Sequence, residues 1–236
     1  NIDNLTLEPT VGGKVELTGQ LNPVWSETPL DWRKIAVLAN FRSELPLEKL
    51  IASYYQLPVE VSLDKFQSVG ILQGTLGNPA GKLQWLLSNA DPTIQGQGEI
   101  ILQDQVINIY NTFIDINGGN VEVNAIASLD SQTWNAQIDS QDIVLTPFLP
   151  TNLPTESVRL NNAQIELAGN FSLEKVDDWS GLAQLNLDVD RGNINVDTQL
   201  NQGTLNTQLQ ARQINVYPEI NLNQAQVNLL LPLDLL

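Results

Sequence analysis

Strict alternation of apolar and polar residues is the feature of this chain that most limits its fold. Between residues 184 and 223, the positions that separate the apolar side chains carry amides and acids: Asn186, Asp188, Asn195, Asp197, Gln199, Asn206, Gln208, Gln210, Asn215, Asn221 and Asn223. This period of two residues is typical of antiparallel strands with one apolar and one solvated face. Each exposed Leu or Ile would forgo roughly 1.5–3 kcal/mol. We therefore predict an all-β fold that buries its apolar face, and a closed barrel, a sandwich and a long U-shaped groove all meet this condition.

An internal repeat runs through the strand pattern. Residues 118–147 and 192–218 each read as two strands that end at a proline. The matching pairs lie 71 positions apart: Ile138 with Leu209, Ile143 with Ile214, Leu145 with Val216, and Pro147 with Pro218. A fixed period predicts stacked units. We expect one elongated domain with repeat units at about residues 1–58, 59–150 and 151–236, cut from a longer protein.

Other segments fit the same scheme with one exception. Alternation predicts strands over residues 15–21, 32–41, 83–87, 99–102 and 106–110. The exception is one short helix near residues 46–56, where Pro46 suits the first turn and Leu47, Leu50, Ile51 and Tyr54 follow helical spacing. We expect the tryptophans to lie near strand ends and to close the core there: Trp25, Trp32, Trp85, Trp134 and Trp179.

Charge and composition exclude several functions. The net charge of −16 disfavours binding to nucleic acid, which needs cationic patches. The chain has no His and no Cys, so the commonest general base and all thiol chemistry are missing. The stretch from Asp188 to Asn193 resembles a calcium loop, but Gln199 stands where the bidentate Glu should be. We predict no catalytic residue, no metal ligand and no cofactor.

Three recurring motifs carry a resemblance to a known family. A strand opener of the form Gly-x-Val/Ile-x-Val/Leu occurs at residues 13–17, 119–123 and 192–196. Proline-flanked apolar stops occur at residues 44–58, 142–150 and 214–220. A glycine-containing strand follows at residues 72–76 and, with one extra residue, at 165–171. With these motifs the chain resembles the TamB family, including its AsmA-like and chloroplast inner-envelope translocon relatives, and its Asn- and Gln-rich style is similar to cyanobacterial members.

The resemblance implies a location and a role. It implies a curled β-sheet, the β-taco, repeated along a rod with an apolar interior. The full-length protein would be anchored in the inner membrane and cross the periplasm, or the intermembrane space of an envelope. It would work with an outer-membrane barrel-assembly protein of the TamA/BamA type, supporting outer-membrane protein assembly or translocation, phospholipid transfer along the groove, or both.

In this reading the functional element is the inward apolar face, which would contact phospholipid acyl chains. The candidate groove residues are Ile138, Ile143, Leu145, Leu185, Leu187, Val189, Ile194, Val196, Leu205, Leu209, Ile214 and Val216. Two alternatives remain open. One is a chaperone or docking scaffold whose open sheet edge adds a strand from a partner. The other is a structural spacer whose groove is filled by its own side chains.

Overall fold

The computed structural model describes residues 2–9, 12–22, 31–46, 65–89, 93–148, 157–171, 176–190, 192–217 and 220–232. Residues 47–64 lie outside this set, so the helix predicted near residues 46–56 is not tested. Trp25 also lies outside the described residues.

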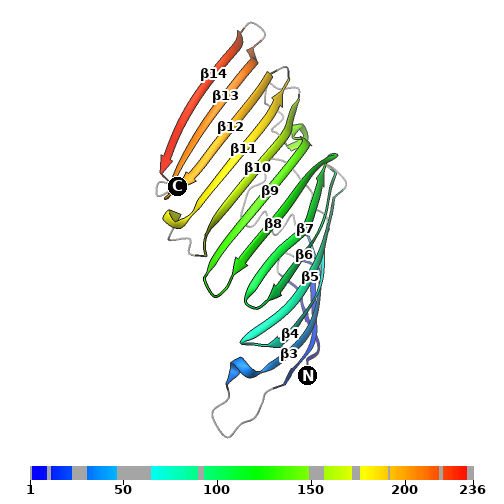
Figure 1. Ribbon diagram of the computed structural model, residues 1–236. Helices are drawn as coiled ribbons and strands as arrows, with labels where there is room; N and C mark the ends of the chain where they lie inside the picture. Colours follow the sequence, from blue (N-terminus) through cyan, green and yellow to red (C-terminus); the bar gives the residue numbers. More distant parts are fainter. Residues whose placement is uncertain are drawn as a thin grey trace. The chain divides into compact units, whose positions relative to one another are not determined.

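The described residues form one antiparallel sheet of 14 strands that follow one another in sequence order (Figure 1). The first seven strands are β1 (Ile2–Leu7), β2 (Lys14–Asn22), β3 (Ala36–Leu45), β4 (Lys65–Thr75), β5 (Asn78–Asn89), β6 (Ile94–Gln103) and β7 (Val106–Ile116). The other seven are β8 (Gly119–Ser128), β9 (Thr133–Val144), β10 (Val158–Asn170), β11 (Ser180–Val189), β12 (Gly192–Asn201), β13 (Thr204–Tyr217) and β14 (Ile220–Pro232).

The prediction of an all-β fold is confirmed, and in the described residues the remaining regular structure consists of 3-10 turns: η1 (Trp32–Lys34), η2 (Thr146–Phe148) and η3 (Val176–Asp178). The strand order is open, since β1 and β14 are not neighbours in it. A closed barrel and a two-sheet sandwich are therefore excluded for the described strands. The curl of the sheet and the three repeat units stay predictions.

One predicted strand begins later than expected. Alternation predicted a strand from Trp32 to Phe41, but β3 starts at Ala36. The carboxylate of Asp31 accepts a hydrogen bond from the Arg33 N–H at 3.1 Å and starts the η1 turn. A side-chain cap of this kind stabilises a turn in place of an extended chain.

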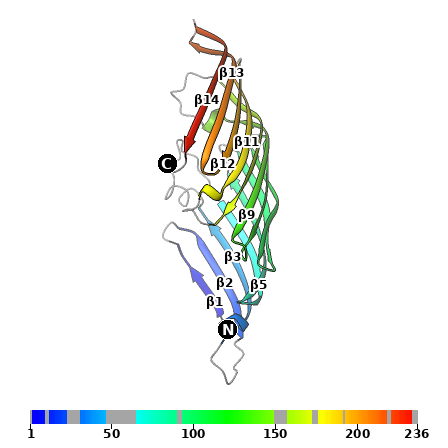
Figure 2. The same ribbon diagram turned by 60° about the vertical axis from the view of Figure 1, so that its left-hand side comes forward.

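The chain forms two compact units. The first contains Asn1–Thr112 and Ile126–Ser131, and the second contains Phe113–Ala125 and Gln132–Leu236. In the second unit, strands β9 to β14 lie side by side in a single layer (Figures 1 and 2). In the first unit, β1 to β6 are likewise paired in order.

Register places the alternating residues of neighbouring strands on common faces. In the second unit, Leu185 of β11 pairs with Val196 of β12, which pairs with Leu209 of β13. The next position on each strand belongs to the opposite face, where Asn186 pairs with Asn195 and Asn195 with Gln210. We call the first side the apolar face and the second the polar face. The tightest core lies on the apolar face, where Ile143, Leu160 and Ala163 are buried.

The strand-opening glycines have a steric cause. Asp142 of β9 and Gln213 of β13 have left-handed backbones, with φ of 61° and 55°. A Cβ on Gly119 would lie 2.6 Å from the Asp142 carbonyl, and a Cβ on Gly192 would lie 2.7 Å from the Gln213 carbonyl. Asp142 and Gln213 are 71 positions apart, the period of the repeat. At Gly119 and Gly192 the Gly-x-Val/Ile opener therefore makes room for a left-handed residue in the strand beside it, whereas at the first opener Gly13 is itself left-handed, with φ of 89°.

Prediction: Gly119→Ala lowers the stability of the protein by about 1–3 kcal/mol, because the new methyl group meets backbone atoms that cannot rotate away. The matched control is Asn120→Ala, at the next and exposed position of β8. Thermal or denaturant unfolding followed by circular dichroism measures both variants. Equal midpoints for the two variants would show that Asp142 relaxes without cost.

Candidate functional site

Most of the predicted groove residues come together on the apolar face of the second unit. One row runs across the strands through Ile143, Leu160, Leu187, Ile194 and Ala211. The next row runs through Ser140, Ala163, Leu185, Val196, Leu209 and Val227. Ile138 pairs with Ile165, and Leu205 pairs with both Leu200 and Leu231. The register thus produces a mainly apolar surface from β9 to β14, interrupted in the Ile138 row by the hydroxyls of Thr198 and Thr207, which hydrogen-bond each other at 3.1 Å.

The remaining predicted residues lie at the margin of this surface. Val189 pairs with Gly192, and the Cδ1 atom of Ile214 lies over Gly192. Leu145, beyond the end of β9, packs against the buried cluster of Ile143, Leu160 and Ala163. Val216 belongs to β13, but its side chain is outside the described residues.

Burial falls along this surface towards β14. Ile143 is 4% exposed, whereas Val227, Leu229 and Leu231 of β14 are 44–48% exposed. Leu185, Leu187, Ile194 and Val196 lie between these extremes. Large apolar side chains left open on one strand are typical of a surface that contacts something else.

The first unit has an apolar hollow that the sequence interpretation did not include. Its volume is about 250 Å³, and it is lined mainly by Leu17, Ala39, Phe41, Leu72, Gly81, Leu83, Ile100 and Leu102. Leu17, Phe41, Leu83 and Ile100 share one row with Gly70. A Cβ on Gly70 would collide with the Phe41 ring. Glycine in the middle of a strand, opposite a large side chain, was the signal that could have found this hollow.

An amide network holds the polar face together across β10, β11 and β12. Asn161 donates to the Asn186 oxygen at 2.7 Å, and Asn186 donates to the Asn195 oxygen at 2.6 Å. Asn193 donates to the Asp188 carboxylate at 3.1 Å. This bond, and then one from Asn161, holds the pKa of Asp188 below its usual value. The network explains the amide-rich alternation as cross-strand pairing.

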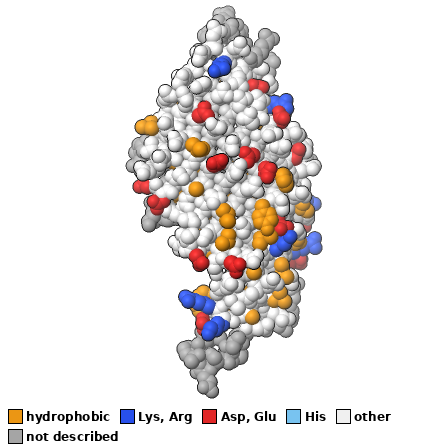
Figure 3. All heavy atoms as spheres, in the orientation of Figure 1, with side chains coloured by type: hydrophobic (Ala, Val, Ile, Leu, Met, Phe, Trp, Pro, Cys, Tyr) orange, Lys and Arg blue, Asp and Glu red, His pale blue; other side chains and the backbone are white. Residues whose placement is uncertain are grey.

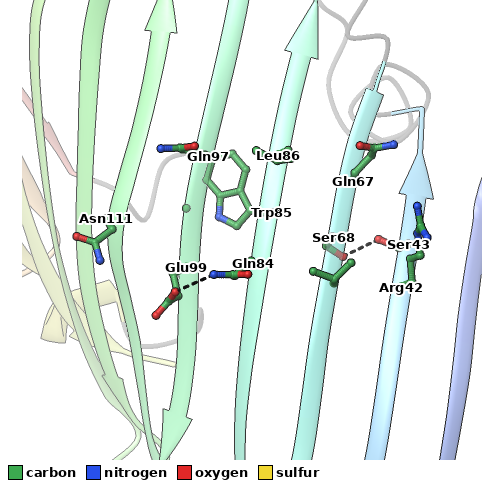
Figure 4. A pocket seen from close by; sticks show the side chains of 12 residues that line it. Arg42, Ser43, Gln67, Ser68, Gln84, Trp85, Leu86, Gln97, Glu99 and Asn111 are labelled. Atoms are coloured by element: carbon green, nitrogen blue, oxygen red, sulfur yellow. Dashed lines mark hydrogen bonds between the residues drawn. The ribbon is translucent and has the colours of Figure 1, made fainter.

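A second hollow, of about 410 Å³, opens on the first unit, on the side of the sheet opposite the hollow at Phe41 and Leu83; we call this side the polar face of the first unit and the side of Phe41 its apolar face (Figure 4). Arg42, Val69, Gln84 and Glu99 form one row of its lining, and Gln67, Leu86 and Gln97 form the next. The row between these two also belongs to the lining and consists of Ser43, Ser68, Trp85 and Gly98. By alternation, the side chains of this row belong to the opposite, apolar face, so the row lies at the floor of the hollow. Asn111 completes the lining.

The tryptophans fit the predicted role only in part. Trp134 is the second residue of β9, and Trp179 directly precedes β11; their rings pack edge to face at 5.4 Å. Trp85 contradicts the prediction, because it lies in the middle of β5 and stacks on Phe66. Trp32 in η1 is 57% exposed beneath the Arg33 guanidinium.

No metal or membrane-spanning element is found in the part of the chain that is described. Its His, Cys, Asp and Glu side chains form no group of three or more that could hold a metal ion. In the same residues, no helix has the length and apolarity needed to cross a bilayer. At the stretch that resembles a calcium loop, the Asp188 carboxylate accepts from Asn193 and that of Asp190 accepts from the Ser157 N–H at 2.9 Å.

Comparison with protein-family models, with curated proteins and with solved structures gives no match for this chain. The resemblance to the TamB family therefore rests on the three motifs alone.

Prediction: Asn193→Ala raises the pKa of Asp188 towards its usual value, because the largest stabilising hydrogen bond to the carboxylate is removed. The folded pKa of Asp188 is depressed, so its contribution to stability is present at neutral pH and is lost as pH falls through that folded pKa. NMR titration of the Asp188 carboxyl carbon measures the shift. In Asn206→Ala, outside the network, the pKa stays as in the parent chain; an unchanged pKa in Asn193→Ala would contradict the assignment.

Proposed function

We propose that this chain is a non-enzymatic periplasmic module of a TamB-like bridge between the inner and outer membranes, and that its apolar face shields phospholipid acyl chains. The observation that carries the proposal is the pair of adjacent rows through Leu187 and Val196, which are apolar from β9 to β14 except at Ser140. In the proposal, the sheet curls so that this face lines a groove. The full-length protein is anchored in the inner membrane and meets an outer-membrane barrel-assembly protein of the TamA/BamA type.

Two properties of the described residues support acyl chains as the cargo. Acyl chains offer no hydrogen bonds, and the rows through Leu187 and Val196 contain apolar side chains with a single hydroxyl, that of Ser140. Partial exposure of Leu185, Leu187, Ile194 and Val196 leaves apolar area that a chain can cover, at roughly 25 cal/mol per Å² removed from water. The hollow at Phe41 and Leu83 extends the same chemistry to the first unit.

Prediction: photo-crosslinking residues placed at Leu187 or Val196 capture phospholipid in cells, because both side chains face the apolar surface. The matched control is Gln184, an exposed neighbour on the polar face of β11, which captures none. Val196→Glu blocks lipid transfer and leaves the circular dichroism spectrum unchanged. Crosslinks to protein alone at Leu187 and Val196 would reject the lipid proposal, and no crosslinks at all would favour a structural spacer.

A second candidate function is strand addition at β14, for a chaperone or docking scaffold. In the described sheet, β14 pairs only with β13. Its apolar face exposes Val227, Leu229 and Leu231, and Leu230 on the other face is 69% exposed. An open edge with apolar side chains is a template for an added strand, here one from a nascent barrel or from an assembly-barrel partner.

Prediction: proline substitutions at Val227 and Asn228 distinguish the free edge from the paired edge of β14. One of two adjacent N–H groups faces β13 and the other faces outward. Proline at the position whose N–H faces outward abolishes capture of the partner strand and keeps the fold. Proline at the position whose N–H faces β13 removes a hydrogen bond of the sheet and lowers the melting temperature. For both proline variants, pull-down with the barrel-assembly partner measures capture and thermal unfolding measures stability. Unchanged capture in both variants would exclude strand addition at β14.

A further inference from the structure

The polar-face hollow of the first unit combines three kinds of contact that the amide network of the second unit lacks. Figure 4 shows its lining side chains on neighbouring strands: Arg42 on β3, Gln67 on β4, Gln84 and Leu86 on β5, Gln97 and Glu99 on β6, and Asn111 on β7. It therefore offers apolar, amide and cationic groups within one concave surface.

The apolar contact of the hollow is exposed, and the same side of the sheet also exposes Leu38 and Ile71. Val69 is 50% exposed and Leu86 is 55% exposed, although both lie on the side of the sheet that is turned away from the apolar face. Space-filling atoms in Figure 3 show apolar side chains emerging among charged ones on the surface of this unit. Val69 pairs with Gln84, so Leu86 is its diagonal neighbour, and the two form a continuous anchor point.

The amide groups of the hollow are available to a ligand. Gln84 donates to the Glu99 carboxylate at 3.3 Å, but Gln67, Gln97 and Asn111 make no side-chain hydrogen bond within the described residues. A primary amide offers donors and an acceptor together, which is the complement of a peptide backbone. Sugar hydroxyls offer the same pair, but the aromatic ring that would stack on a sugar, Trp85, belongs to the opposite face.

The cation of the hollow is also available. Lys82 lies 2.6 Å from the Glu99 carboxylate, and this ion pair holds the pKa of Glu99 below its usual value. Lys14 is paired with Glu16 in the same way. Arg42 forms no ion pair or hydrogen bond within the described residues, but it lies directly across from Glu16 of β2 and attracts that carboxylate electrostatically. An unpaired guanidinium beside exposed apolar side chains is complementary to a carboxylate that stands next to an apolar group.

We propose that this hollow binds an extended peptide segment in which an acidic residue follows an apolar residue by two positions. Side chains two positions apart point to the same side of an extended chain, so the apolar one contacts Leu86 and Val69 while the carboxylate meets Arg42. Gln67 and Gln97 hydrogen-bond the peptide backbone between them. An anionic membrane surface could meet the same guanidinium, so anionic vesicles are included in the test.

The test uses the full chain and a fluorescent peptide of roughly ten residues with repeated Thr-Leu-Thr-Glu sequence, followed by anisotropy. Arg42→Gln weakens binding about tenfold, because a charge-assisted contact is lost, and Arg42→Lys restores part of it. Leu86→Asn weakens binding to a similar extent. A matched peptide with Lys in place of Glu binds at least about tenfold more weakly to the parent chain.

The second unit supplies the matched control. Leu182 is 51% exposed in a polar-face hollow of about 560 Å³, whose lining includes Gln137, Glu166 and Gln199 but no cation. Leu182→Asn therefore leaves peptide affinity unchanged. Equal loss in Leu182→Asn and Leu86→Asn, or equal affinity for the Lys and Glu peptides, would overturn the proposal. Absence of peptide binding would also overturn it, as would binding to anionic phosphatidylglycerol vesicles that Arg42→Gln abolishes while peptide binding stays unchanged. Lipid crosslinking at Leu187 is independent of all these outcomes.

Discussion

Cross-strand register is the constraint on which both faces of the sheet depend. Side chains alternate with a period of two, so a shift of one residue in a single strand would move its whole apolar set to the polar face. In the second unit, the pairing of Leu185 with Val196 and of Asn186 with Asn195 comes from one register. The hydrogen bonds between amide side chains on the polar face and the contacts between apolar side chains on the other face both favour that register. Left-handed residues at Asp142 and Gln213, each matched to a neighbouring glycine, fix it further at the strand ends.

Alternation alone predicted strands wherever it was unbroken, as between residues 181 and 189, where β11 lies. It could not predict the order of the strands, because every order of strands buries an alternating face equally well. It was wrong at Trp32, where a local hydrogen bond from the Arg33 N–H to the Asp31 carboxylate competes with the extended chain. The groove residues were predicted only around the second unit, since Gly70 and Gly81 interrupt the apolar pattern of β4 and β5. In three dimensions those glycines make space for Phe41 and Leu72.

The two faces of the sheet have different binding chemistry. The apolar face of the second unit has no charged side chain in its rows through Leu187 and Val196, so it suits a ligand without hydrogen-bonding groups. In the second unit the polar face is mostly self-satisfied at the Asn186 network, whereas in the first unit the hollow at Leu86 keeps amides and a guanidinium that have no hydrogen bond or ion pair within the described residues. In each unit the two sides of the sheet therefore present different chemistry to a ligand.

The pairing of an opener glycine with a left-handed residue has a consequence for how strands are inserted into such a chain or deleted from it. Gly119 and Asp142 lie on adjacent strands, β8 and β9, as Gly192 and Gln213 lie on β12 and β13. The two members of a pair depend on each other. A glycine without the left-handed neighbour only lowers the stability of its strand, and a left-handed residue would collide with the Cβ atom of any other residue in the glycine's place. Neighbouring strands also run in opposite directions. We therefore expect such a sheet to gain or lose whole hairpins of two strands, and not single strands. Each gain or loss of a hairpin then keeps the apolar side chains on one face and the polar side chains on the other.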